Sequence, residues 1–80
     1  MSIELRNLRQ FVAIAELGSY RRASQALFIA QPALSVSIRK LEEAVGAPLL
    51  TRGARGVTLT QAGAALLADA RRALFHADQG

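Results

Sequence analysis

One stretch of the sequence, residues 34–45, constrains the fold more than any other feature. Its large apolar residues recur at steps of four, three and four: Leu34, Ile38, Leu41 and Val45. At about 100° per residue, this spacing places all four on one face of an α-helix. Gly46 can end such a helix and Pro48 prevents its continuation. Pro32 suits the first turn, so the sequence predicts a helix at about 31–45.

Two shorter helices are predicted before it. The first has an apolar series at steps of three and four: Leu5, Leu8, Phe11, Val12 and Ala15. Gly18 is placed to end this helix, and Ser19 can cap the next one. The second helix directs Tyr20, Ala23 and Leu27 inward and ends where residues 28–30 break the pattern. The second helix and the helix at about 31–45, joined by the short segment 28–30, form a helix-turn-helix.

After Pro48 the period changes from that of a helix to that of a strand. Residues 49–52 and 57–60 are predicted strands, joined by the glycine-flanked turn Gly53-Ala54-Arg55-Gly56. Thr60 can then cap a fourth helix that runs from about Gln61 to the end. The expected fold class is mainly α. It comprises a winged helix-turn-helix of three helices and a β-hairpin wing over residues 1–60, followed by a long linker or dimerisation helix over 61–80.

The composition excludes several classes of function. The chain has 80 residues, no cysteine and a single histidine, so disulfides and thiolate metal sites are impossible and His76 cannot hold a metal alone. No paired carboxylates, activated nucleophile or glycine-rich phosphate loop is present, so we expect no enzyme and no cofactor in this domain. No signal peptide and no apolar stretch of about 18 residues occurs. These features, with the lack of cysteine, predict a cytoplasmic protein.

The net charge of +4 favours an anionic partner such as nucleic acid. The excess lies in residues 1–60, while the acids and bases of the last twenty residues cancel. Nearly all of the positive charge is arginine, whose planar guanidinium suits phosphate and guanine edges. The distribution of positive charge therefore indicates that the helix-turn-helix and the wing bind the anionic partner.

The outward face of the 31–45 helix is the predicted DNA-reading surface. Its candidate contacts are Gln31, Pro32, Ser35, Val36, Arg39 and Lys40. Gln31 can bond adenine bidentately, Ser35 can reach a base or a phosphate, and Arg39 can reach phosphate or guanine. Val36 is an apolar residue that points outward, where it could pack on a thymine methyl group. The alternative is a solvated helix face of mixed composition.

Three further arginines extend this surface. Arg52 and Arg55 flank the hairpin turn, where they could lie along phosphates or enter a narrow minor groove. Arg22, on the second helix, is a further candidate DNA contact. The alternative for the wing is a pair of solvated loop arginines.

The fourth helix carries a second regular stripe. Its members are spaced at three, four and three residues: Leu67, Ala70, Leu74 and Ala77. This is the spacing of a coiled-coil seam. Only the start of the helix is expected to reach the body of the domain, so the sequence predicts that a second subunit covers the stripe.

Two long strings carry a resemblance to a known family. LRQFVAIAELGSYRRASQAL and QPALSVSIRKLEEAVGAPLLTRGARGVTLTQAG resemble the N-terminal DNA-binding domain of LysR-type bacterial transcriptional regulators. The resemblance implies a dimer held by the fourth helix and a tetramer in the full-length protein on promoter DNA. It also implies a missing C-terminal domain that senses a small-molecule effector. A two-fold dimer predicts an inverted-repeat site.

The sequence departs from the family pattern at two positions of interest. Ala30 stands where the family usually has a serine or threonine that caps the recognition helix, and Val36 stands where many members have arginine. The competing hypothesis is a winged-helix protein-interaction module that binds no DNA. Such modules usually lose the arginines that this chain keeps at positions 39, 52 and 55.

Overall fold

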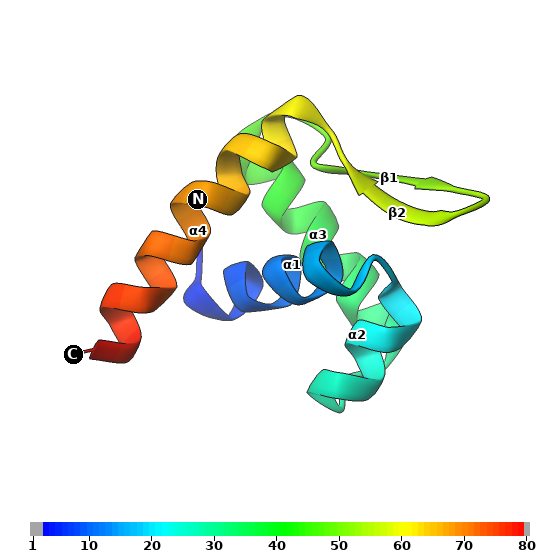
Figure 1. Cartoon of the computed structure of the whole chain (residues 1–80), viewed down its shortest axis with the longest axis horizontal. Coiled ribbons are helices and arrows are strands. Elements are labelled where there is room, and N and C mark those ends of the chain that lie inside the picture. Colours follow the sequence, from blue (N-terminus) through cyan, green and yellow to red (C-terminus); the bar gives the residue numbers. More distant parts are fainter. Residues whose placement is uncertain (1–2, 80) are drawn as a thin grey trace.

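The computed structural model describes residues 3–79 and contains four helices and one β-hairpin (Figure 1). The elements are α1 Leu5–Leu17, α2 Tyr20–Leu27, α3 Gln31–Val45, β1 Leu50–Gly53, β2 Gly56–Leu59 and α4 Gln61–Gln79. The predicted fold class and the predicted order of elements are therefore confirmed. No helix within this described range is long and apolar enough to cross a membrane.

The helix ends follow from local chemistry. The Ser19 Oγ accepts the Arg22 backbone N–H over 3.1 Å, which confirms it as the N-cap of α2. The Thr60 Oγ1 accepts the Gly63 backbone N–H over 3.0 Å and caps α4 in the same way. α1 and α3 end at Gly18 and Gly46, both in the left-handed conformation that glycine adopts readily.

The core lies where α1 meets α2, α3 and α4 (Figure 1). Its largest fully buried side chains come from α1, α3 and the segment before β1: Phe11, Ile14, Leu34, Leu41 and Leu49. The inward face predicted for the third helix is confirmed at Leu34, Ile38 and Leu41. Val45 was expected there too, but it is 38% exposed because the buried part of α3 stops one turn earlier, at Leu41.

The hairpin pairs Leu50 with Leu59 and Gly53 with Gly56, so its turn consists of Ala54 and Arg55. The strands cover 50–53 and 56–59, one residue away from the predicted ranges 49–52 and 57–60. As predicted, Val57 and Leu59 pack against the core while Thr58 is exposed. The Val57 backbone N–H donates to the Gly18 carbonyl oxygen over 3.0 Å, which ties β2 to the junction between α1 and α2.

α4 lies along α1 for more of its length than the sequence indicated. Ala70 is only 1% exposed, and Leu67 and Leu74 are half-buried against the core. The expectation that only the start of this helix reaches the body is wrong, and Ala70 is covered by its own chain. The physical reason is that α1 offers an apolar face that α4 can bury without a partner, as its contacts with α4 show.

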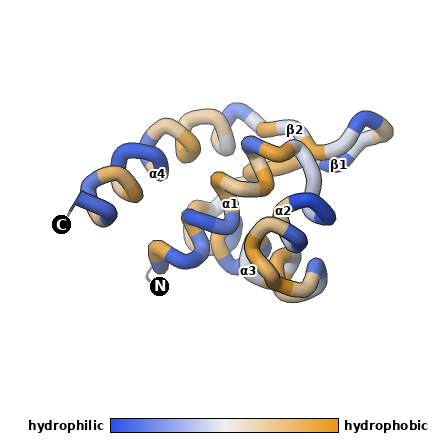
Figure 2. Tube along the Cα trace, turned by 60° about the horizontal axis from the view of Figure 1, so that its bottom comes forward, coloured by the Kyte–Doolittle hydropathy of each residue, from blue (hydrophilic) through white to orange (hydrophobic). Residues whose placement is uncertain are grey.

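Ion pairs hold the second half of α4 to α1. This half carries most of the hydrophilic residues of the helix (Figure 2). Arg9 Nη2 lies 2.7 Å from Asp78 Oδ1, and Arg71 Nη2 lies 3.1 Å from Glu16 Oε2. The predicted stripe therefore faces inward along most of α4, and of its members only Ala77 is exposed.

Candidate nucleic-acid interface

α3 presents most of the predicted contact residues on its outer side. Exposed members of this set are Gln31, Pro32, Val36, Arg39 and Lys40, whereas Ser35 is half-buried on the side toward the wing. Val36 is 45% exposed, which is high for a valine in a helix that contributes three residues to the hydrophobic core. The outward valine inferred from the sequence is thus confirmed as a structural feature.

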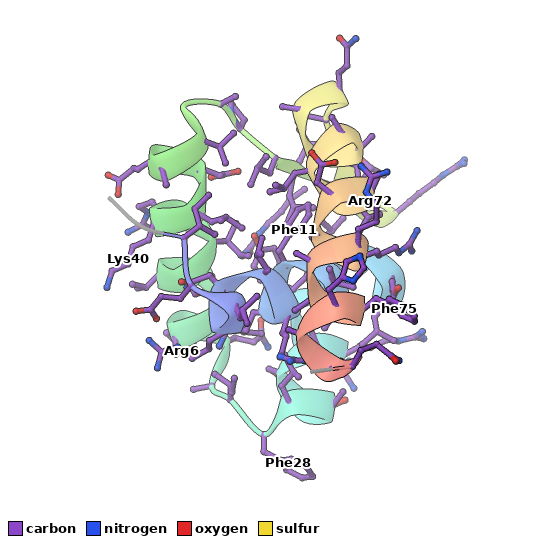
Figure 3. The ribbon with its side chains drawn as sticks, turned by 90° about the vertical axis from the view of Figure 1, so that its left-hand side faces the viewer. Arg6, Phe11, Phe28, Lys40, Arg72 and Phe75 are labelled. Carbon is purple, nitrogen blue, oxygen red and sulfur yellow. The ribbon has the colours of Figure 1, made fainter. Side chains whose placement is uncertain are left out.

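The start of α3 has no side-chain cap. Ala30 occupies the N-cap position and forms no side-chain hydrogen bond to the helix, as its methyl side chain dictates. Just before it, Phe28 is in the left-handed conformation with φ 57° and is 94% exposed. Phe28 points away from the body at the tip of the helix-turn-helix (Figure 3).

Lys40 lies on the flank of α3 away from the wing. With Val36 it lines a groove of about 870 Å³ between α3 and the N-terminal segment, which contributes Ile3 before α1 and Arg6 in its first turn. Lys40 and Arg6 extend into solvent on the same side of the molecule (Figure 3). On this flank of α3, Lys40 forms no ion pair within residues 3–79, whereas Arg6 is paired with Glu4.

Arg55 is at the tip of the wing, in the two-residue turn between β1 and β2. It is exposed, and within residues 3–79 its guanidinium forms no ion pair. The structure places it where the sequence predicted, as a free cation on a projecting hairpin.

Arg52 differs from that expectation. Its guanidinium carbon lies 3.9 Å from the centre of the Tyr20 ring, and its Nη2 donates to the Ser35 Oγ over 3.2 Å. Arg52 therefore connects β1 to α2 and α3 instead of extending freely. Sequence reasoning assigned Tyr20 only an inward position and missed this contact, because no spacing rule relates residues 20, 35 and 52.

Arg22 is exposed on the first turn of α2, beside Arg21. Only its backbone N–H is engaged, by Ser19, so its guanidinium is free to bind an external anion. Arg21 has the same exposure, and the sequence interpretation did not include it.

The ion pairs separate the charges of this molecule into two groups. Four salt bridges join four of the ten cations to four of the six acids. Within residues 3–79, the cations outside these pairs are Arg21, Arg22, Arg39, Lys40, Arg52 and Arg55. All six lie on α2, α3 or the wing, where only Glu42 and Glu43 oppose them. The entire net charge of +4 therefore resides on these three elements.

Of the two acids there, Glu42 has a structural role. Its Oε2 accepts the Leu49 backbone N–H over 2.8 Å, which fixes the chain as it leaves α3 for the wing. Glu43 is exposed near the end of α3. The first half of α3 is thus free of acidic side chains, whereas its second half is not.

Residues 5–64 match the family described as bacterial regulatory helix-turn-helix protein, lysR family. The chain belongs to the LysR family. This LysR-family chain is 51% identical over 76 residues to the HTH-type transcriptional regulator BudR of Klebsiella aerogenes, covering 95% of the chain and 53% of BudR. It is also 51% identical over 78 residues to the uncharacterized regulator YnfL of Escherichia coli, covering 98% of the chain and 26% of YnfL. The chain thus spans about half of BudR and about a quarter of YnfL.

Solved LysR-family structures share the fold closely. The DNA-binding domain of CbnR in complex with DNA matches with a TM-score of 0.90 and 42% identity, covering 95% of this chain and 87% of that one. The DNA-binding domain of BenM in complex with its benA site 1 DNA matches with a TM-score of 0.90 and 46% identity, covering 95% and 88%. The winged helix-turn-helix of this LysR-family chain is therefore the architecture of domains solved with DNA bound.

Proposed function

We propose that this chain is the sequence-specific, double-stranded DNA-binding domain of a LysR-type transcriptional regulator. The observation that carries the proposal is the distribution of charge. Within residues 3–79, six cations without acidic partners lie on α2, α3 and the wing, while the remaining four form ion pairs elsewhere. A surface of this kind attracts the phosphate backbone and releases its counterions.

We propose a role in DNA binding for each element. A major groove about 12 Å wide admits an α-helix, so α3 enters it with Gln31, Ser35 and Val36 toward the bases. Arg39 and Lys40 reach the flanking phosphates or a guanine edge. Arg55 at the wing tip lies on phosphates or in the adjacent minor groove, and Arg22 approaches the backbone from α2. The related CbnR and BenM domains were solved in complex with DNA, which supports DNA binding by this chain.

The proposal for the whole protein is broader than this domain. From the resemblance to LysR-type regulators, we propose that the full-length protein also has a C-terminal domain that binds a small-molecule effector. We propose that this protein acts as a tetramer in the cytoplasm. It works by occupying promoter DNA and not by catalysis. This domain itself requires no cofactor.

We further propose a homodimer formed through the free side of α4. The exposed apolar residues on that side are Ala64, Ala68 and Phe75, and Phe75 is 61% exposed. This surface replaces the inward-facing stripe as the main contact, and Ala77, two residues after Phe75, lies on nearly the opposite side of the helix. A two-fold contact is self-complementary and presents two copies of α3 to an inverted repeat.

Selection from a random duplex library tests the proposed function. The 80-residue chain is incubated with the library at two salt concentrations, and the bound fraction is sequenced. We expect an enriched inverted repeat and an affinity that falls steeply with salt. A chain that enriches no sequence and binds duplexes no better than it binds a neutral polymer would instead be a protein-interaction module.

A further inference from the structure

Arg52 lies on the wing, but its side chain contacts residues on other elements. Its guanidinium covers the Tyr20 ring at 3.9 Å and donates to the Ser35 Oγ over 3.2 Å. Arg55, three residues further on, forms no side-chain hydrogen bond within residues 3–79. The two wing arginines, which are alike in sequence, are thus in different chemical situations.

The contact with Arg52 determines what the Ser35 hydroxyl can do. A serine hydroxyl has one proton to donate and two lone pairs that accept. The Arg52 N–H occupies one lone pair, and the hydroxyl proton cannot point at another donor, so it is directed elsewhere. A serine inside a helix often donates to the carbonyl four residues earlier, but Ser35 forms no such bond within the described residues. Its proton therefore remains available on the partly exposed surface of α3.

We propose that Arg52 is a positioning residue that makes Ser35 a hydrogen-bond donor to DNA, while Arg55 is the wing arginine that neutralises phosphate. The inference rests on the proposed DNA binding. The matching ligand chemistry is a hydrogen-bond acceptor, which in DNA is purine N7, guanine O6 or thymine O4 in the major groove, or a phosphate oxygen. A charged donor on the Ser35 oxygen also strengthens the bond that the hydroxyl donates.

Because Arg52 stacks on the Tyr20 ring, the effect of its planar shape can be tested separately from the effect of its charge. A planar guanidinium stacks on an aromatic ring and still donates from its edge, whereas a lysine ammonium is a point charge without a flat face. Arg52→Lys therefore keeps the charge and loses the geometry that holds Ser35. The matched control is Arg55→Lys, which keeps a charge at the free wing tip.

The experiment measures affinity by fluorescence anisotropy on a duplex selected by the wild-type chain, over a range of salt concentrations. We expect Arg52→Lys and Ser35→Ala each to weaken binding by about 3- to 10-fold, and the double variant to be no weaker than either one. The slope of log K against log salt should be unchanged by Arg52→Lys. Arg55→Lys should bind almost as tightly as wild type, and Arg55→Ala should reduce the slope by about 0.9.

Two results would overturn the assignment. Wild-type affinity in Arg52→Lys, with a slope reduced by about 0.9 in Arg52→Ala, would make Arg52 an ordinary phosphate contact. If the losses of affinity in the double variant were additive, Arg52 and Ser35 would act independently of each other. Repeating the selection distinguishes the acceptors, since a base acceptor relaxes the same base pair in both variants and a phosphate acceptor weakens all sequences equally.

A measurement without DNA separates this inference from the proposed function. In the free chain, the Tyr20 ring should shift the NMR signals of the Arg52 side-chain protons upfield, and Tyr20→Leu should remove that shift. Its absence in the wild-type chain would overturn the positioning contact even if the chain binds DNA. A wild-type chain that shows the shift but selects no sequence would overturn the proposed function and, with it, the role of Ser35.

Discussion

The carbonyl oxygen of Leu49 lies against the backbone of Gly63, so that a β-carbon on Gly63 would come within 2.0 Å of it. The same oxygen accepts the Thr60 backbone N–H over 3.0 Å. This close approach joins the segment before the wing to the first turn of α4. Only a residue without a side chain fits there.

Gly63→Ala should therefore destabilise the chain, although alanine is favoured over glycine in a helix by about 1 kcal/mol. The clash is with backbone, which cannot rotate away, and overpacking of this kind costs about 1–3 kcal/mol. We expect a lower free energy of unfolding in urea titrations. Ala65→Gly, at an exposed position of the same helix, is the control and should cost only the helix preference. A Gly63→Ala chain more stable than wild type would contradict the packing described.

Arg55→Ala should weaken binding to all duplexes similarly. The reason is that a free, exposed arginine on the wing interacts with phosphate and not with a particular base. The slope of log K against log salt should fall in magnitude by about 0.9. Arg72→Ala is the control, since Arg72 is paired with Asp69 on α4 and should leave the slope unchanged. A change of sequence preference with an intact slope would make Arg55 a base reader.

Val36→Ala and Gln31→Ala should each relax the preference at one base pair. Val36 is an exposed large apolar residue on the leading half of α3, so its simplest partner is a thymine methyl group, whereas Gln31 can bond adenine. The expected losses are fractions of the about 1–3 kcal/mol typical of a good base contact. Selected sequences identical to those of wild type in both variants would remove these residues from the reading surface.

Phe75→Glu should weaken self-association without unfolding the chain, because Phe75 projects from the free side of α4. Leu74→Asp should behave differently. Leu74 packs against the core, so a charge there should lower the free energy of unfolding of the monomer as well. Analytical ultracentrifugation, with and without a duplex carrying two half-sites about 10 bp apart, measures the association. If Phe75→Glu dimerises as well as wild type, the interface lies elsewhere.

Asp78 should titrate below the usual range of an aspartate. The hydrogen bond from Arg9 lowers the pKa of this carboxyl, with a smaller contribution from the charge of Arg9. A lowered folded-state pKa means that the pair stabilises the fold above the ordinary aspartate pKa, and that this contribution is lost as the pH falls through the lowered pKa. NMR titration of the Asp78 carboxyl measures the shift, and Arg9→Gln should return it toward the ordinary value. An unshifted Asp78 in wild type would show that the pair does not form in solution.

Local chemistry is sufficient to predict the elements of this fold and the exposed side of α3. The period of Leu34, Ile38 and Leu41 defines the buried side of α3, and therefore also its exposed side, because a helix has a fixed angle per residue. Ser19 and Thr60 identify helix starts through bonds made within three residues. Patterns of this kind depend only on neighbours along the chain.

Contacts between distant residues were decided only by the tertiary structure. The stripe of α4 was correctly recognised as apolar, but whether α1 or a second subunit covers Ala70 depends on where the helix packs. Arg52 and Arg55 look equivalent in sequence, yet the hairpin places one beside Tyr20 and leaves the other at the tip. The physical reason is the same in both cases. A helix or strand period specifies which side of an element a residue occupies, whereas its partner across space is set by the packing of whole elements.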